Sequence, residues 1–191
     1  MSKATETLYK SNPVNHKRLA TDKLFLDASD VKFSGLLDDA VRFTEKKQLL
    51  DRAHWKRFVD QFRFQDDGEN RGWRGEYWGK MMRGGAFVYS YTKNEELYQV
   101  LTETVCDMLT CAEPDGRVST YSRETEFGGW DIWCRKYVLL GMQYYLEICS
   151  DDELRQKIVS FMCGSLDYLI ERIGNEPGKR NITSCSGCWR G

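Results

Sequence analysis

Two kinds of hydrophobic pattern alternate along the second half of the chain. Residues 78–91 (WGKMMRGGAFVYSY) and 133–149 (WCRKYVLLGMQYYLEIC) are apolar on nearly every side of a helix, and a helix without a polar face is normally buried. Residues 97–112 and 154–173 instead carry a single apolar stripe at helical spacing on otherwise polar segments. The predicted helices are therefore a buried inner pair, 76–91 and 131–149, and a half-exposed outer pair, 95–112 and 151–173.

The same order of patterns occurs twice at a fixed offset. Leu97 and Leu154 are 57 residues apart, as are Gly84 and Gly141, and the polar turns before the two leucines also match. Acidic residues at the start of each outer helix suit the positive end of its dipole. The sequence therefore predicts a helical hairpin, made of one inner and one outer helix, that is present twice.

Alternating buried and amphipathic helices are what a double ring of helices requires, because inner helices touch neighbours on every side and outer helices touch the ring on one face. An open solenoid of stacked hairpins gives a similar pattern. A helical pattern over 31–63 brings the predicted hairpins to about three, half the number in an (α/α)6 toroid. We therefore expect an all-α fold in which residues 23–191 form an incomplete (α/α)6 barrel. The uncovered flanks of half a ring expose apolar surface, so self-association is expected.

The remaining segments are less regular. Residues 1–22 are polar and without period, which predicts a flexible N-terminal arm. Asp30 or Ser34 is expected to cap the first helix of the 31–63 segment. Residues 65–75 have the composition of a loop, and residues 118–121 are predicted to be briefly extended.

Charge and composition exclude several classes of function. The 191 residues include 28 basic and 29 acidic side chains, a formal net charge of −1, so the chain lacks the basic excess that nucleic-acid binding requires. It contains no run of 18 apolar residues, so no membrane helix is expected, and the polar first 30 residues argue for a cytoplasmic rather than a secreted protein. The seven cysteines are accordingly expected to be mainly free, buried thiols. Cys185 and Cys188 form one C-x-x-C pair, which is half of a zinc site or a redox motif.

Four segments occur in an order that resembles a known family. They are residues 73–80 (WRGEYWGK), 91–97 (YTKNEEL), 115–121 (DGRVSTY) and 129–137 (GWDIWCRKY). This ordered set resembles the N-terminal half of the catalytic domain of the beta-L-arabinofuranosidase-like family, glycoside hydrolase family 127 and its relatives. The resemblance runs from about Asp22 to the end of the sequence. It implies an (α/α)6 barrel that hydrolyses a carbohydrate with retention of configuration.

The resemblance also implies a zinc-bound cysteine nucleophile and a glutamate acid/base in the full-length family. Both are expected beyond Gly191, so no catalytic residue and no zinc ligand is carried over to this sequence. In the family, the helix corresponding to 130–146 opens with a motif like H-E-L-Y-C-x-G-H. Here Trp130 and Tyr137 occupy the positions of the two histidines, which points to a divergent branch, and an arabinofuranoside substrate is therefore not carried over.

Six residues near the starts of the two inner helices are candidates for sugar binding. Inner helices of a toroid run in the same direction, so these ends are expected to meet at one rim of the central cavity. Aromatic faces stack on the apolar face of a sugar, and carboxylates accept protons from its hydroxyl groups. The candidates are Glu76, Trp78, Trp130, Asp131, Trp133 and Tyr137.

The alternative interpretation of these residues is structural. The tryptophans then fill the core, and Glu76 and Asp131 cap helices or pair with the lysines and arginines near them. Glu76 and Asp131 are also conceivable as a pair of catalytic carboxylates, although the resemblance assigns catalysis elsewhere. Glu124 and Glu126 are expected on a solvated rim. Two functions remain open: a glycoside hydrolase-like protein that lacks its catalytic half, and a non-catalytic α-hairpin module that binds a glycan or a protein.

Overall fold

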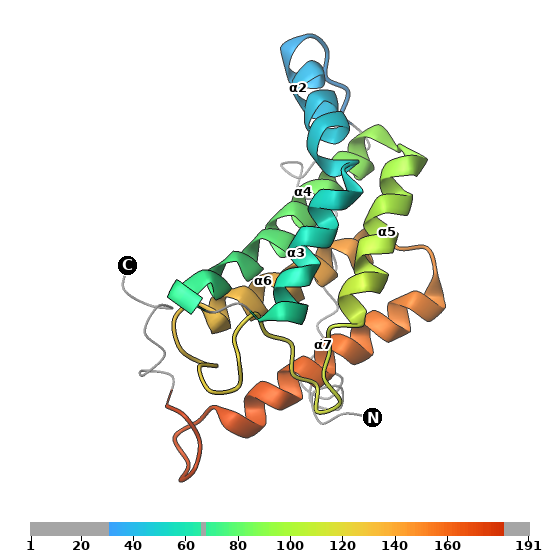
Figure 1. Ribbon diagram of the computed structural model, residues 1–191. Helices are drawn as coiled ribbons and strands as arrows, with labels where there is room; N and C mark the ends of the chain where they lie inside the picture. Colours follow the sequence, from blue (N-terminus) through green and yellow to red (C-terminus); the bar gives the residue numbers. More distant parts are fainter. Residues whose placement is uncertain (1–30, 66–67, 182–191) are drawn as a thin grey trace.

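The computed structural model describes residues 31–65 and 68–181, and this part of the chain is all-α (Figure 1). No strand occurs within these residues, apart from a single bridge between Ile173 and Arg180. The predicted arm over 1–22 and the Cys185–Cys188 pair lie outside the described residues. The elements in order are α2 (Leu36–Thr44), a π-helical turn η2 (Glu45–Leu49), α3 (Arg52–Phe64), a 3-10 helix η3 (Gly68–Gly75), α4 (Glu76–Thr92), α5 (Glu95–Leu109), α6 (Asp131–Ile148) and α7 (Asp152–Arg172).

The four helices predicted from the alternating patterns are confirmed as α4, α5, α6 and α7. Gln99 and Lys157 on the outer helices are exposed, whereas Val88, Tyr137 and Leu140 on the inner helices are half-buried. The two outer helices also begin with equivalent N-terminal caps. Asn94 and Asp151 occupy equivalent positions, and each side chain accepts a backbone N–H in the first turn of the outer helix that follows it.

The two inner helices lie side by side and run in the same direction. Glu76 contacts Trp133 and Phe87 contacts Tyr144, so the helices meet at a constant offset of 57 residues along their length. Their backbones touch at Gly79, where an added Cβ would lie 1.8 Å from the carbonyl oxygen of Tyr137. The two inner helices therefore approach each other closely at this glycine.

The hydrophobic core lies between the inner helices and the helices that cover their back. α5 contributes one continuous apolar stripe to this core, and α3 and α7 pack on either side of α5. Trp78 of α4 is fully buried inside the core. The second half of α7 packs on a smaller cluster formed by Phe127 and Tyr168, and Ile170 near its end remains 57% exposed.

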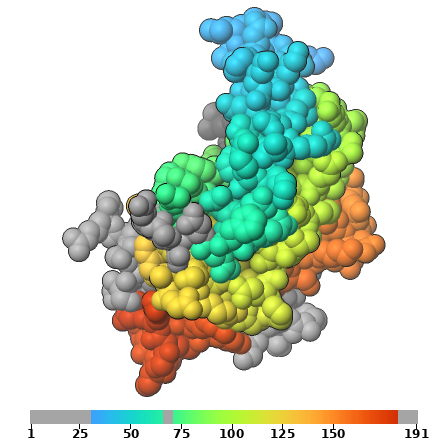
Figure 2. All heavy atoms as spheres, viewed as in Figure 1, coloured from blue at the N-terminus to red at the C-terminus, as the bar shows by residue number. Residues whose placement is uncertain are grey.

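The segment over 31–63 does not form a hairpin. α2 has no buried residue, and it stands out from the molecule instead of packing back on α3 (Figures 1 and 2). Gly35 occupies its N-cap position and no side chain caps it, so the expected cap at Ser34 is wrong, and Asp30 lies outside the described residues. A real cap begins α3, where the Asp51 carboxylate accepts the N–H groups of Ala53 and His54.

Residues 118–121 form no paired strand and belong to a buried loop against η3, where the Thr120 hydroxyl donates to the carbonyl oxygen of Gly72. Among residues 31–65 and 68–181, α3, α5 and α7 cover only the back of the inner helices, so these helices are not surrounded on every side by the described elements. No helix in the described part of the chain has the length and apolar character needed to cross a membrane.

Candidate functional site

The uncovered side of α4 and α6 forms one surface, which we call the front face. Along α4 it consists of a charged row that ends in an aromatic ring, and along α6 of an aromatic row with one leucine. Each residue of one row is 57 positions from its neighbour in the other, so the repeat places the rows in register. The front face comprises Glu76, Lys80, Arg83 and Phe87 of α4 and Trp133, Tyr137, Leu140 and Tyr144 of α6, flanked by Trp130 and Lys136.

Aromatic side chains are in contact along the start of α6. The ring of Trp133 lies 6.1 Å from that of Trp130 and 5.3 Å from that of Tyr137, both in edge-to-face geometry. Trp130, at the N-cap position, is 40% exposed, and Trp133 and Tyr137 are half-buried. Helical spacing explains the alignment, because positions i, i+3 and i+7 share one face. The three rings make an apolar strip that is open to solvent.

One carboxylate is fixed beside this strip. Glu76 accepts a hydrogen bond from the indole N–H of Trp133 and pairs with Lys80 at 2.9 Å. The hydrogen bond to Glu76 outweighs partial burial and raises the pKa of Lys80, which keeps the ammonium charged. Glu76 is thus held in one orientation with a neutralising partner.

Cations lie over the aromatic rings of the front face. The ammonium of Lys136 is 3.4 Å from the ring centre of Trp133, and that of Lys80 is 4.9 Å from the ring centre of Tyr137. The guanidinium of Arg83 lies 5.6 Å from the ring centre of Tyr144. Such contacts are worth about 0.5–1 kcal/mol each at exposed sites. The front face therefore combines three cations with one carboxylate.

Four of the six candidate residues are brought together on this surface and two are not. Glu76, Trp130, Trp133 and Tyr137 lie on or beside the front face. Trp78 is fully buried, and its indole N–H donates to the Thr104 hydroxyl at 3.0 Å.

Asp131 is also fully buried, and its carboxylate is held by groups of the interior. It accepts the hydroxyl of Ser119 at 2.6 Å and the backbone N–H of Phe127 at 2.8 Å, and it pairs with Arg135 at 2.9 Å. Trp78 and Asp131 therefore reach no open surface. Trp78 fills the core and Asp131 pairs with an arginine, as the structural alternative predicts.

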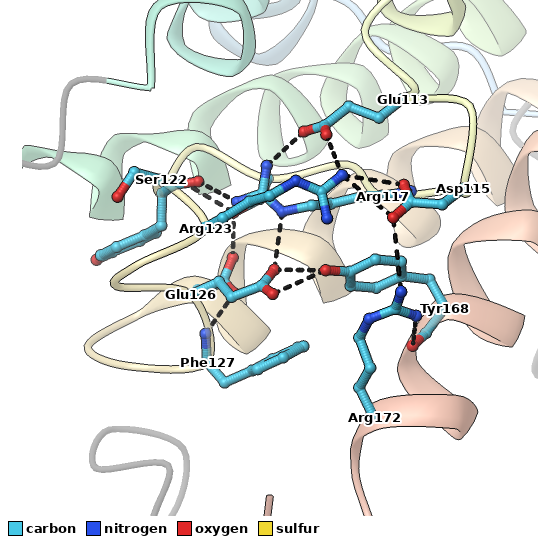
Figure 3. A network of polar contacts seen from close by, with 12 residues as sticks. Glu113, Asp115, Arg117, Ser122, Arg123, Glu126, Phe127, Tyr168 and Arg172 are labelled. Atoms are coloured by element: carbon cyan, nitrogen blue, oxygen red, sulfur yellow. Dashed lines mark hydrogen bonds and ion pairs between the residues drawn. The ribbon is translucent and has the colours of Figure 1, made fainter. Parts of the chain in front are cut away.

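A buried ionic network holds the loop between α5 and α6 (Figure 3). Glu126 is 8% exposed and accepts hydrogen bonds from Arg117, Arg135 and the Tyr168 hydroxyl at 2.7–2.9 Å. Arg117 continues the network to Glu113. The expectation of a solvated Glu126 is wrong, because two buried guanidinium groups need a carboxylate partner. The network ties the loop to α6 and α7 and so fixes the start of α6, where Trp130 begins the aromatic strip.

Arg135 is the most enclosed cation of this network. Its side chain is fully buried between the rings of Phe127 and Tyr168, at 5.0 and 5.2 Å from their centres. Its Nε and Nη2 groups bind Asp131 and Glu126, whereas Nη1 is buried without a hydrogen-bond partner in the described structure. The sequence pattern alone does not single out Arg135, because the adjacent Lys136 of the same segment is exposed.

This network makes stability sensitive to acid. Burial alone would raise the pKa of Glu126, but hydrogen bonds from Arg117 and Tyr168 and the charge of Arg135 lower it below its usual value. A carboxylate with a lowered folded-state pKa stabilises the fold above its unfolded pKa of about 4.3 and loses that effect as the pH falls. We therefore expect the urea midpoint to fall steeply below about pH 4. Glu126→Gln should flatten that dependence, and an unchanged slope in this variant would contradict the assignment.

The family resemblance places its zinc centre beyond Gly191, and the described cysteines and histidine form no metal site of their own. Among residues 31–65 and 68–181, no group of three His, Cys, Asp or Glu side chains is close enough to hold a metal ion. The thiol of Cys134 lies against the carbonyl oxygens of Gly72 and Trp73, and burial raises its pKa to about 12, so it is no nucleophile at neutral pH. His54 lies beside Asp51 on the far side of the core. No reaction step is therefore assigned to a metal.

The comparisons with known proteins identify no relative of this chain. No protein-family model matches the sequence, no curated protein matches it, and no solved structure matches the fold. The resemblance to the beta-L-arabinofuranosidase-like family consequently rests on the four sequence segments alone. Any function must be argued from the geometry of the front face.

Proposed function

We propose that the front face is one wall of a carbohydrate site in a glycoside hydrolase-like (α/α)6 protein, as the sequence resemblance implies. The observation that carries the proposal is the open strip of Trp130, Trp133 and Tyr137 at the start of an inner helix. Aromatic rings offer a flat apolar surface to the C–H groups of a sugar ring. A half-toroid of inner and outer hairpins would turn this strip toward the central cavity.

Polar groups beside the strip would orient the sugar. Glu76 lies against the indole of Trp133 and is able to accept a hydrogen bond from a sugar hydroxyl, while Lys80 next to it is able to donate one. Both side chains are held by their mutual ion pair, so little conformational entropy is lost when a ligand binds. This combination of fixed polar groups with an apolar platform is typical of small-molecule sites.

We assign binding, and not bond cleavage, to these residues. Hydrolysis by two carboxylates requires both to face the glycosidic bond at about 5–9.5 Å from each other. Asp131 is enclosed by Arg135 and Ser119, and Glu76 is already paired with Lys80. The resemblance likewise places the acid/base and the nucleophile elsewhere. We therefore expect no turnover of aryl glycosides by this chain alone, with or without zinc.

The second candidate function is a non-catalytic glycan-binding module. The engagement of both candidate carboxylates in ion pairs favours it, since neither is free for acid/base chemistry. The two candidates share the front face and differ only in whether further residues complete a reaction centre.

The test of the proposed function is sugar binding to the front face. Isothermal titration with a panel of neutral and acidic oligosaccharides should detect binding in the millimolar range, because one wall buries little of a ligand. Trp133→Ala should weaken that binding at least tenfold. Phe64→Ala is the matched control, because this aromatic residue on α3 is 75% exposed and lies outside the front face, and it should leave binding unchanged. Absence of binding to the whole panel, or equal effects of the two variants, would refute the proposal.

A further inference from the structure

The charge of the front face differs from that of the whole chain. The chain as a whole has a net charge of −1, yet the front face holds Lys80, Arg83 and Lys136 against the single carboxylate of Glu76. Glu76 neutralises Lys80. Within the described part of the chain, no carboxylate pairs with Arg83 or Lys136. Two positive charges on this surface are therefore not paired with any carboxylate of the described residues.

Lys136 occupies the position that a stacked sugar would need. Its ammonium lies 3.4 Å from the ring centre of Trp133 and 4.5 Å from that of Tyr137, so it contacts both rings. A sugar that stacks on Trp133 must move this ammonium aside and give up a cation–π contact of about 0.5–1 kcal/mol. A neutral sugar offers the displaced ammonium only hydroxyl groups, whereas a sugar with a carboxylate offers it an ion pair.

Resting on the proposed function, we propose that the front face selects sugars that carry a carboxylate, namely uronic acid residues, with the ring on Trp133 and the carboxylate paired with Lys136. The side chain of Lys136 is exposed and flexible, so it can leave the ring and follow the ligand. Arg83, one turn beyond Lys80 on α4, adds positive potential on the same surface and favours an anionic ligand over a neutral one. With a uronate bound, the displaced ammonium of Lys136 gains an ion pair in place of its contact with the ring.

The experiment compares one oligosaccharide in two charge states. Oligogalacturonides and the same oligomers with methyl-esterified carboxyl groups have the same ring and size, and differ in charge. Titration calorimetry at low salt should show about 1.5- to fivefold tighter binding of the acid form, which is the range expected for a partly exposed ion pair. Lys136→Gln should remove this preference and leave binding of the ester unchanged or slightly tighter, because the ring is uncovered. Lys157→Gln on α7, an exposed lysine far from the front face, is the matched control and should behave as the wild type.

The possible outcomes separate the two proposals. Equal binding of the acid and the ester would overturn the selection of uronates but would not contradict the proposed carbohydrate site. A preference for the acid that persists in Lys136→Gln would overturn the role of Lys136. Binding of neither form, and of no other sugar in the panel, would overturn the proposed function and this inference with it. Binding of a sulfated oligosaccharide as tight as that of the uronate would show selection by charge alone and would also contradict the proposal.

Discussion

Arg135→Met is expected to lower the free energy of unfolding by about 3–5 kcal/mol, because it removes one partner of a fully buried ionic network. The guanidinium of Arg135 binds both Asp131 and Glu126, and Asp131 has no exposed surface. Without Arg135, the negative charge of Asp131 stays buried without a cation, since its remaining partners are a hydroxyl and a backbone N–H. Methionine is similar in length and fills the space between Phe127 and Tyr168, so the loss reports the charge and not a cavity.

The expected loss can be measured by urea denaturation at pH 7. Lys157→Met is the matched control, because this exposed lysine of α7 lies outside the network and pairs only with the exposed Glu153, and it should change stability by less than about 0.5 kcal/mol. A folded domain has only about 5–15 kcal/mol in total, so Arg135→Met is able to prevent folding altogether. Glu126→Gln then serves as the milder variant, since it keeps the hydrogen-bonding shape. Losses below about 1 kcal/mol in both variants would contradict the structural role of the network.

The helices could be predicted from the sequence because their signals are local. The stripe on α5 from Leu97 to Met108 and the caps at Asn94 and Asp151 act within a few residues, so neither depends on the rest of the fold. The loop between α5 and α6 carries no such period. Its conformation is fixed by Arg117 and Arg135, which reach Glu126 from different elements, and side-chain partners across elements are not visible in a hydrophobic pattern.

The candidate site could be predicted only in part, and helical geometry explains which part. Successive helical residues turn by about 100°, so residues two apart point in nearly opposite directions. Glu76 and Trp78 therefore cannot share the front face, and neither can Asp131 and Trp133. Residues three, four or seven apart do share a face, and this spacing singles out Trp130, Trp133 and Tyr137. Lys80 and Arg83 follow from Glu76 in the same way, and this signal was available before the structure.

The contact between the inner helices gives the second large prediction. Gly79→Ala is expected to cost at least about 2 kcal/mol, because its Cβ would lie 1.8 Å from the carbonyl oxygen of Tyr137. The clash is with backbone, so no side chain can rotate away to relieve it, and α4 and α6 must separate. Separation would also pull Lys80 away from Tyr137 and Glu76 away from Trp133, so sugar binding at the front face should fall together with stability.

Gly84→Ala, five residues later on the same helix, isolates the effect of that clash. A Cβ at Gly84 meets nothing within 4 Å, so this variant gains only the better helix propensity of alanine, about 0.5–1 kcal/mol. Both variants make the same chemical change in α4, and they should shift the urea midpoint in opposite directions. Heteronuclear NMR spectra should show large shifts along α6 only for Gly79→Ala. If Gly79→Ala were as stable as Gly84→Ala, the two inner helices would not be in backbone contact, and the register that aligns the front face would be wrong.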